Sequence, residues 1–174
     1  MEHKKPQEVI IGNMFMNNKI FYTDGACKGN PGPGGYGVVE MKDNKILYEY
    51  SEYCDNTTNN REELKAILHV FELAAADKSN TYIIYSDSSY AVNIINDWIF
   101  TWVKNNWINS KGNQVENLDL ILNLYKYVTI NFFNCQVKKC TAHVGEVGNE
   151  LADALATNNQ SKYNKLKKEH FDIL

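Results

Sequence analysis

Residues 22–37 read YTDGACKGNPGPGGYG. A run of strand-forming residues leads into Asp24, and a loop dense in glycine and proline follows it. Such a loop is typical of tight turns, because glycine adopts backbone conformations that other residues avoid and proline fixes φ. Asp24 follows Ile20 and Tyr22 at a spacing of two, so it shares their face of the predicted strand. The stretch therefore predicts a strand that delivers a carboxylate beside a loop.

The regions around this stretch alternate between strand and helix patterns. Asp43 and Asn44 suit a hairpin turn between two strands, and an apolar stripe through Leu64, Ile67 and Phe71 marks a long helix. The predicted strands span 19–27, 37–42, 45–54, 81–86 and 130–137, and the predicted helices span 60–76, 98–106, 118–128 and 149–157, with a further helix beginning after Asp87. This order predicts an α/β fold whose sheet starts antiparallel and continues with parallel strands.

Length and composition indicate one ordinary globular domain. The chain has 174 residues, of which 44% are hydrophobic and 22% are charged. It contains no apolar run long enough to span a membrane and no signal peptide is evident. The four cysteines lack the spacing of a zinc site, so we expect free thiols and an intracellular, reducing compartment, cytoplasm or nucleus.

The net charge of −3 is a mild argument against nucleic-acid binding, because contact with phosphates relies on lysine and arginine. The argument weakens if acidic residues cluster at a metal site, since bound cations would invert the local field.

Three further segments carry acidic or histidine side chains. Residues 58–64 read TNNREEL, 85–88 read YSDS, and 143–153 read HVGEVGNELAD. Together with 22–37, and in this order, they resemble the signature of the type 1 ribonuclease H family over roughly residues 17–160. The resemblance implies a ribonuclease H-like fold, a five-stranded mixed sheet with helices on both faces. It divides the chain into a short tail at 1–16, a catalytic domain at 17–160 and a basic tail at 161–174.

The resemblance identifies Asp24, Glu63, Asp87 and Asp153 as a set of four metal-binding carboxylates. Oxygen ligands suit Mg²⁺, with Mn²⁺ as an alternative, and two ions about 4 Å apart can support phosphoryl displacement. Without cations, four converging acids would repel one another. Taken singly, Asp24 could be a turn residue at the strand end, Asp87 a helix N-cap, and Asp153 a complement to a helix dipole.

Helix geometry separates Glu63 from its neighbour Glu62. Glu63 lies four residues before Ile67, so it falls on the apolar stripe, where a carboxylate is costly unless something pairs with it. Glu62 falls nearer Lys65 and His69, on the wetter side. We therefore expect Glu63 to be the ligand and Glu62 to be a solvated charge.

The resemblance also assigns roles around the carboxylates. His143, in a glycine-containing loop, would move protons or help release product; the alternative is an idle surface histidine. Family members contact the 2′-hydroxyls of the RNA strand. The positions that match these contacts are Cys27, Asn30, Asn59 and Asn60. Thr58 matches a contact to a DNA phosphate, and Ser89 stands where bacterial members often carry glutamine, so its RNA contact is an open question. Asn59 could instead cap the following helix.

Trp98, Trp102 and Trp107 match tryptophans of the family's handle, a helical protrusion that grips DNA. Trp98 and Trp102 lie four residues apart and so share a helix face, which makes packing an equal alternative for each. Lys104 and Lys111 are the only basic residues between Trp98 and Gly112, so the handle is weakly basic.

The predicted function is a monomeric, metal-dependent endonuclease that cuts the RNA strand of an RNA:DNA hybrid and leaves 5′-phosphate and 3′-hydroxyl ends. No membrane partner is expected. Another nuclease or an integrase on the same fold is a second interpretation, and a hybrid-binding module without catalysis is a third.

Overall fold

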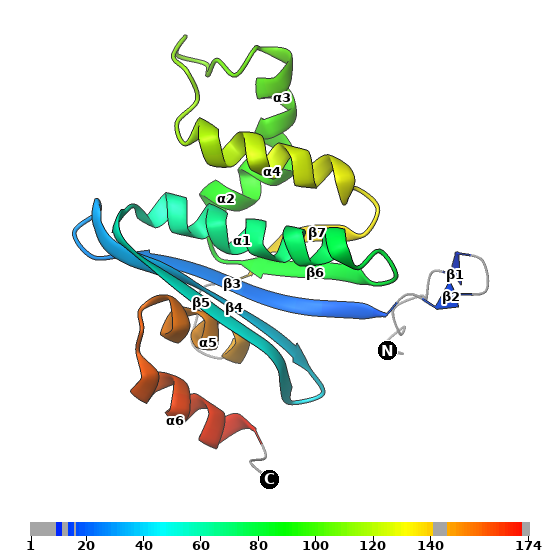
Figure 1. The fold of residues 1–174 in the computed structure, drawn as a ribbon, viewed down its shortest axis with the longest axis vertical. Coiled ribbons are helices and arrows are strands. Elements are labelled where there is room, and N and C mark those ends of the chain that lie inside the picture. The colour runs from blue at the N-terminus through cyan, green and yellow to red at the C-terminus, as the bar shows by residue number, and fades with distance from the viewer. Residues whose placement is uncertain (1–9, 12–13, 16, 141–145, 172–174) are drawn as a thin grey trace, which may run out of the picture.

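A five-stranded sheet forms the centre of the molecule in the computed structural model, which describes residues 10–11, 14–15, 17–140 and 146–171 (Figure 1). The strands lie in the order β5-β4-β3-β6-β7. They span β3 Asn18–Cys27, β4 Gly32–Lys42, β5 Lys45–Thr57, β6 Thr81–Ser86 and β7 Cys135–Lys139. Two short strands, β1 Ile10–Ile11 and β2 Met14–Phe15, pair with each other outside this sheet.

The direction of the strands changes at β3. β3 pairs antiparallel with β4, and β4 pairs antiparallel with β5 across a turn at Asp43 and Asn44, both of which have positive φ. On its other side β3 pairs parallel with β6, which pairs parallel with β7. This is the mixed sheet that the order of elements predicted.

Helices cover both faces of the sheet (Figure 1). They span α1 Asn59–Ala76, α2 Ser89–Asn93, the π-helix η1 Ile94–Trp98, α3 Ile99–Lys104, α4 Leu118–Ile130, α5 Val147–Ala156 and α6 Gln160–His170. α1 packs on one face with α2 and α4 beyond it, and α5 and α6 lie on the other. The predicted five-stranded mixed sheet with helices on both faces is confirmed.

Each face of the sheet has its own hydrophobic core. The larger core joins β3, β4 and β6 to the apolar stripe of α1, in which Leu64, Ile67 and Phe71 are buried. The smaller core joins Val39 of β4 to Leu151 of α5 and to Tyr163 and Leu166 of α6. The burial of these apolar side chains is the main contribution that holds both helical layers on the sheet.

The last strand begins later than predicted. Residues 130–137 were expected to form it, but α4 continues to Ile130 and a turn precedes Cys135. Asn131 is buried in this turn, and its amide donates to the carbonyl oxygens of Phe71 at 3.0 Å and Tyr127 at 2.9 Å. These bonds satisfy the end of α4 and displace the strand start, a contact between distant segments that local patterns do not encode.

The end of the chain also differs in character from a plain basic tail. Most of residues 161–171 belong to α6, which buries Tyr163 and Leu166 while Lys165 and Lys168 are exposed. The helix begins at the cap residue Asn159, whose side chain accepts a hydrogen bond from the backbone N–H of Lys162.

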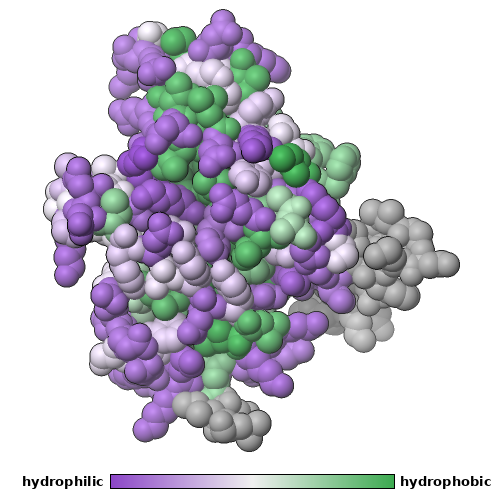
Figure 2. Space-filling view, in the orientation of Figure 1, coloured by the Kyte–Doolittle hydropathy of each residue, from purple (hydrophilic) through white to green (hydrophobic). Residues whose placement is uncertain are grey.

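Three further features of the described residues bear on function. No helix among the described residues has the length and apolar character required to cross a bilayer. All four cysteines are free. Exposed apolar side chains include Trp98, Phe100 and Leu122, and Figure 2 shows green patches over the α3–α4 region on a face that is otherwise largely hydrophilic.

Candidate active site

Parallel pairing of β3 with β6 brings the first two acids together. Thr23 lies opposite Ser86 in the register, so Asp24 and Asp87, one residue further along each chain, become neighbours. Asp87 follows the last residue of β6 directly. Ser88, not Asp87, caps α2, because its side chain accepts the Ala91 N–H at 3.1 Å. The carboxylate of Asp87 is therefore not used as a helix cap.

A close approach of α1 to β3 supplies the third acid. A Cβ atom on Gly25 would lie 2.3 Å from the backbone nitrogen of Glu63, so only glycine allows the helix to approach β3 this closely. The glycine that follows Asp24 thus places Glu63 above the strand that carries Asp24. One carboxylate oxygen from each of Asp24, Glu63 and Asp87 lies within 4.8 Å of the others.

Burial and mutual repulsion make this cluster electrostatically unfavourable without a cation. Burial, followed by repulsion from Asp87, raises the pKa of Asp24 to about 7. Burial, followed by repulsion from Asp24, raises the pKa of Glu63 well above its usual range. Glu63 Oε2 is buried and has no hydrogen-bond partner. An oxygen-lined cluster with an unpartnered buried oxygen fits a hard divalent cation.

Two polar side chains outside the cluster contact Asp87. Asn149, buried in α5, directs its amide toward Asp87 Oδ2 at 3.4 Å, and Lys139 donates to the backbone carbonyl of Asp87. The sequence pattern did not single out either residue for this contact, although Asn149 lies within the GNELAD segment.

Asp153 is near the cluster but is bound by a lysine. It lies in α5, which approaches β4 so closely that a Cβ on Gly37 would meet the carbonyl oxygen of Ala152 at 2.4 Å. Its negative charge adds to burial and Asp87 in raising the pKa of Asp24. Asp153 Oδ2 accepts a hydrogen bond from Lys162 Nζ at 2.6 Å. Three of the four predicted acids therefore form one group, and the fourth adjoins it in an ion pair.

Glu62 is not the solvated charge that helix geometry predicted. Its side chain is 1% exposed, accepts the Thr57 hydroxyl at 2.6 Å and pairs with Lys65 at 2.7 Å. The prediction was wrong because it treated the side of α1 beyond the apolar stripe as solvent. The end of β5 covers that side, and it brings Thr57 to Glu62.

The comparisons with known proteins agree with this geometry. The ribonuclease H family model matches residues 16–161. A ribonuclease H of Caldanaerobacter subterraneus is 43% identical over 158 residues, which cover 87% of this chain and 98% of that one. This chain belongs to the ribonuclease H family.

Solved structures superpose on this fold. A type 1 ribonuclease H with the type 2 active-site motif superposes with a TM-score of 0.68 at 27% identity, over 83% of this chain and 72% of that one. A foamy viral protease-reverse transcriptase in complex with an RNA/DNA hybrid superposes with a TM-score of 0.72 at 21% identity, over 94% of this chain and 22% of that one. The second likeness concerns the fold alone.

The structure brings most of the positions matched to substrate contacts in the ribonuclease H family to one surface. Asn30, in the glycine-rich loop, accepts the backbone N–H of Asn59 at 3.0 Å, which joins this loop to the start of α1. Asn59 and Asn60 are exposed in the first turn of α1. Cys27 is half-buried beneath them, and its thiol donates to the carbonyl oxygen of Thr57 at 3.3 Å.

Thr58 and Ser89 have different local environments. Thr58 is the N-cap of α1, and its hydroxyl accepts the Arg61 N–H at 3.2 Å, so the alternative that Asn59 caps this helix is wrong. Ser89 is exposed in the first turn of α2, two residues after Asp87.

The two handle tryptophans contact each other. The ring centroids of Trp98 and Trp102 lie 5.9 Å apart. Trp102 packs against the larger core, and Trp98 is 38% exposed. Packing therefore accounts for Trp102, while Trp98 also presents surface to solvent. His143, the predicted proton carrier, lies outside the described residues.

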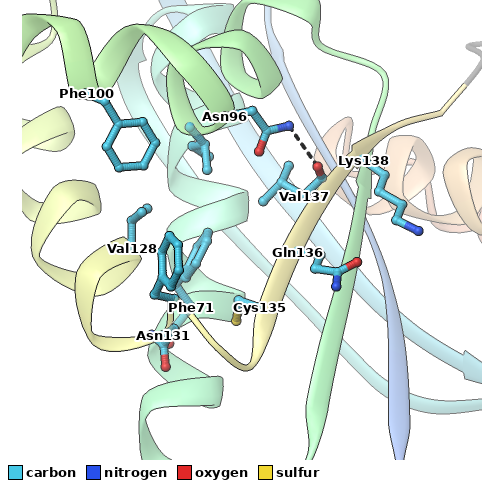
Figure 3. A pocket seen from close by; sticks show the side chains of 11 residues that line it. Phe71, Asn96, Phe100, Val128, Asn131, Cys135, Gln136, Val137 and Lys138 are labelled. Carbon is cyan, nitrogen blue, oxygen red and sulfur yellow. Dashed lines mark hydrogen bonds between the residues drawn. The ribbon is translucent and has the colours of Figure 1, made fainter. Parts of the chain in front are cut away.

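A pocket of about 360 Å³ lies apart from the acidic cluster. Phe71, Phe100 and Val128 line it on the helical side and Gln136 on the β7 side, and the Asn96 amide donates to the carbonyl oxygen of Val137 at its rim (Figure 3). No residue predicted for the site lines this pocket.

Proposed function

We propose that the chain is an endonuclease that hydrolyses the RNA strand of RNA:DNA hybrids. The observation that carries the proposal is the convergence of Asp24, Glu63 and Asp87, with one buried Glu63 oxygen unpartnered, at the junction of β3, β6 and α1. Membership of the ribonuclease H family supports the same activity.

The acidic cluster is proposed to hold Mg²⁺, with Mn²⁺ able to replace it, and Asp153 is proposed to complete a site for a second ion. When bound, the two ions would supply activation of the attacking water and stabilisation of the leaving oxygen. The protein's own contribution is to hold the carboxylates close together in a largely buried place. Metal binding would then favour the ionised form of Asp24 and Glu63, whose pKa values are otherwise raised by burial.

Substrate selection is proposed to occur where the glycine-rich loop meets α1. Asn30, Asn59 and Asn60 are exposed there and offer both donors and acceptors, which suits the 2′-hydroxyls of an RNA strand. Cys27, which is half-buried, is also proposed to contact the RNA strand. Thr58 is proposed to contact a phosphate of the DNA strand. Ser89, two residues from Asp87, is proposed to contact RNA beside the cut.

The exposed ring of Trp98 is proposed to contact the DNA strand together with the weakly basic handle, with Trp102 as its packing support. His143 is proposed to carry a proton or assist product release. We propose that residues 17–160 form the catalytic domain and that the protein acts as a monomer in a reducing compartment.

The test is cleavage of an end-labelled RNA strand in a hybrid, compared with duplex RNA and duplex DNA, in Mg²⁺, in Mn²⁺ and in chelator. We expect cleavage of the hybrid alone, dependence on added metal, and 5′-phosphate and 3′-hydroxyl product ends. Asp24→Asn, Glu63→Gln and Asp87→Asn should each remove most activity without unfolding the protein. Turnover at the wild-type rate in any of them would refute the assignment, and hybrid binding without cleavage by the wild type would indicate a binding module.

A further inference from the structure

Lys162 places a positive charge on the one predicted metal ligand that stands outside the acidic cluster. Its Nζ lies 2.6 Å from Asp153 Oδ2. Within the part of the chain that the structure describes, Asp24, Glu63 and Asp87 make no ion pair with lysine or arginine. Among the described residues, the one cationic side chain that binds a carboxylate of the set is therefore Lys162, on Asp153.

The position of Lys162 is set by the way α6 packs. Asn159 caps the helix through the Lys162 N–H at 3.0 Å. One residue later, Tyr163 is buried against the second face of the sheet and donates to Glu49. Leu166, one turn further along, is buried beside it. The backbone of Lys162 is thus held next to α5, and its side chain reaches Asp153.

The ion pair itself is open to water and replaceable. The side chains of Lys162 and Asp153 are 36% and 40% exposed. Pairs with this degree of exposure are weak, because water competes for both charges and the lysine side chain loses freedom when it pairs. A divalent cation bound to Asp153 would repel an ammonium group on the same carboxylate oxygen, so the two compete for it.

We propose that Lys162 is a positioning residue that acts through Asp153 as a removable counter-charge, and that it lowers the affinity of the second metal ion. This inference rests on the metal sites of the proposed function. Lys162 holds the Asp153 carboxylate in place while the second ion is absent, and it must withdraw when that ion binds. The protein therefore needs a higher metal concentration to fill the second site than its four carboxylates alone would require.

Lys162 lies one residue beyond the part of the chain that the family model matches. The family model ends at residue 161, whereas α6 spans Gln160–His170. The same helix provides a matched control in Lys165, whose side chain is 74% exposed and lies 3.8 Å from Glu169. Neutralising Lys165 removes the same charge from α6 without touching Asp153.

The experiment is a calorimetric titration of Mg²⁺, and separately of Mn²⁺, into the full chain without nucleic acid. We expect Lys162→Gln and Lys162→Met to tighten the weaker of two binding events by about two- to fivefold, the range expected for release of a half-exposed ion pair. Lys162→Arg and Lys165→Gln should match the wild type. In an Asp153→Asn background, Lys162→Gln should have no further effect.

An equal shift in Lys162→Gln and Lys165→Gln would overturn the inference in favour of a general charge effect. A shift that persists in the Asp153→Asn background would show that Lys162 does not act through Asp153, and weaker binding in Lys162→Gln would show that the lysine aids the ion. A single binding event in both the wild type and Lys162→Gln would also overturn the inference. Hybrid cleavage by the wild type is measured separately. If cleavage occurs but the titration fails, the proposed function stands and the inference falls. If cleavage is absent, the proposed function is refuted whatever the titration gives.

Discussion

Glu62 and Glu63, adjacent near the start of α1, are both buried but lie in opposite electrostatic surroundings. Glu62 has two partners, the Thr57 hydroxyl and the Lys65 ammonium. Glu63 faces Asp24 and Asp87, and one of its oxygens has no partner. Successive residues of a helix point in directions about 100° apart, so one glutamate stabilises the fold while its neighbour is available to a cation.

The two glutamates should therefore respond oppositely to amidation. Glu62→Gln should lower the free energy of unfolding by about 1–3 kcal/mol, because Lys65 loses a buried charged partner. Glu63→Gln should raise the free energy of unfolding in metal-free buffer near neutral pH, because an acid whose pKa is raised by burial and by Asp24 is removed. Denaturant unfolding measures both, and hybrid cleavage should survive in Glu62→Gln and be lost in Glu63→Gln. Destabilisation of the metal-free protein by Glu63→Gln would contradict this account.

The stability of the metal-free protein should depend on Asp24 between its ordinary pKa of 3.8 and its raised pKa of about 7. The folded state holds the Asp24 proton more tightly than the unfolded chain does. The protonated carboxyl therefore contributes its full stabilisation of the folded state below the ordinary pKa, and this stabilisation is lost as pH rises through the raised pKa. The melting temperature of the wild type relative to Asp24→Asn should therefore fall as pH rises across this window. Calorimetric scans in chelator measure the difference.

Metal binding should show the reverse dependence on pH. Cations require ionised ligands, so Mg²⁺ affinity should rise as pH increases through about 7, where Asp24 loses its proton. Mg²⁺ should accordingly raise the melting temperature more above this pH than below it. A thermal shift by Mg²⁺ that is independent of pH would argue against binding at Asp24.

Gly25→Ala should disrupt the junction of β3 and α1. The added methyl group would lie 2.3 Å from Glu63 N, against backbone that cannot move aside easily. We expect a loss of about 3 kcal/mol or more in the free energy of unfolding, with loss of activity. Gly112→Ala is the control: its φ of +82° disfavours alanine, but nothing lies within 4 Å of the new atom, so the cost should be near 1 kcal/mol. Equal losses in the two variants would contradict the steric argument.

The RNA contacts should be visible on a modified substrate. A hybrid whose RNA strand carries one deoxy sugar beside the scissile bond should be cut about two- to tenfold more slowly there, which corresponds to the loss of one hydrogen bond. A deoxy sugar placed far from the cut should have no effect. Unchanged cutting at the modified position would remove the proposed role of Asn30, Asn59 and Asn60.

The handle should contribute little to electrostatic grip. Lys104→Ala together with Lys111→Ala removes at most two phosphate partners, so the slope of log K against log salt should flatten by about 2 or less. Turnover at saturating hybrid should be unchanged, because neither lysine adjoins the acidic cluster. Lost turnover in the folded double variant would make the handle part of the catalytic apparatus.

The sequence by itself determined most of the elements and the ends of the strands at which Asp24 and Asp87 stand. Period-two strands, the apolar stripe of α1 and the Asp43–Asn44 turn are local patterns, and the structure contains the elements they predict. Asp24 and Asp87 were predictable as neighbours once their strands were recognised as adjacent and parallel, because each acid stands at the same point along its strand.

Only the tertiary structure decided what surrounds those acids. The burial of Glu62 depends on Thr57 at the end of β5, the late start of β7 depends on Asn131 contacting α1, and the ion pair of Asp153 depends on the docking of α6. None of these contacts has a periodic signature, because each joins a helix to a neighbouring element whose position is set by tertiary packing. A helix buries its apolar stripe, but whether its other side faces water or protein depends on which elements pack against it. Those elements are set by the tertiary structure.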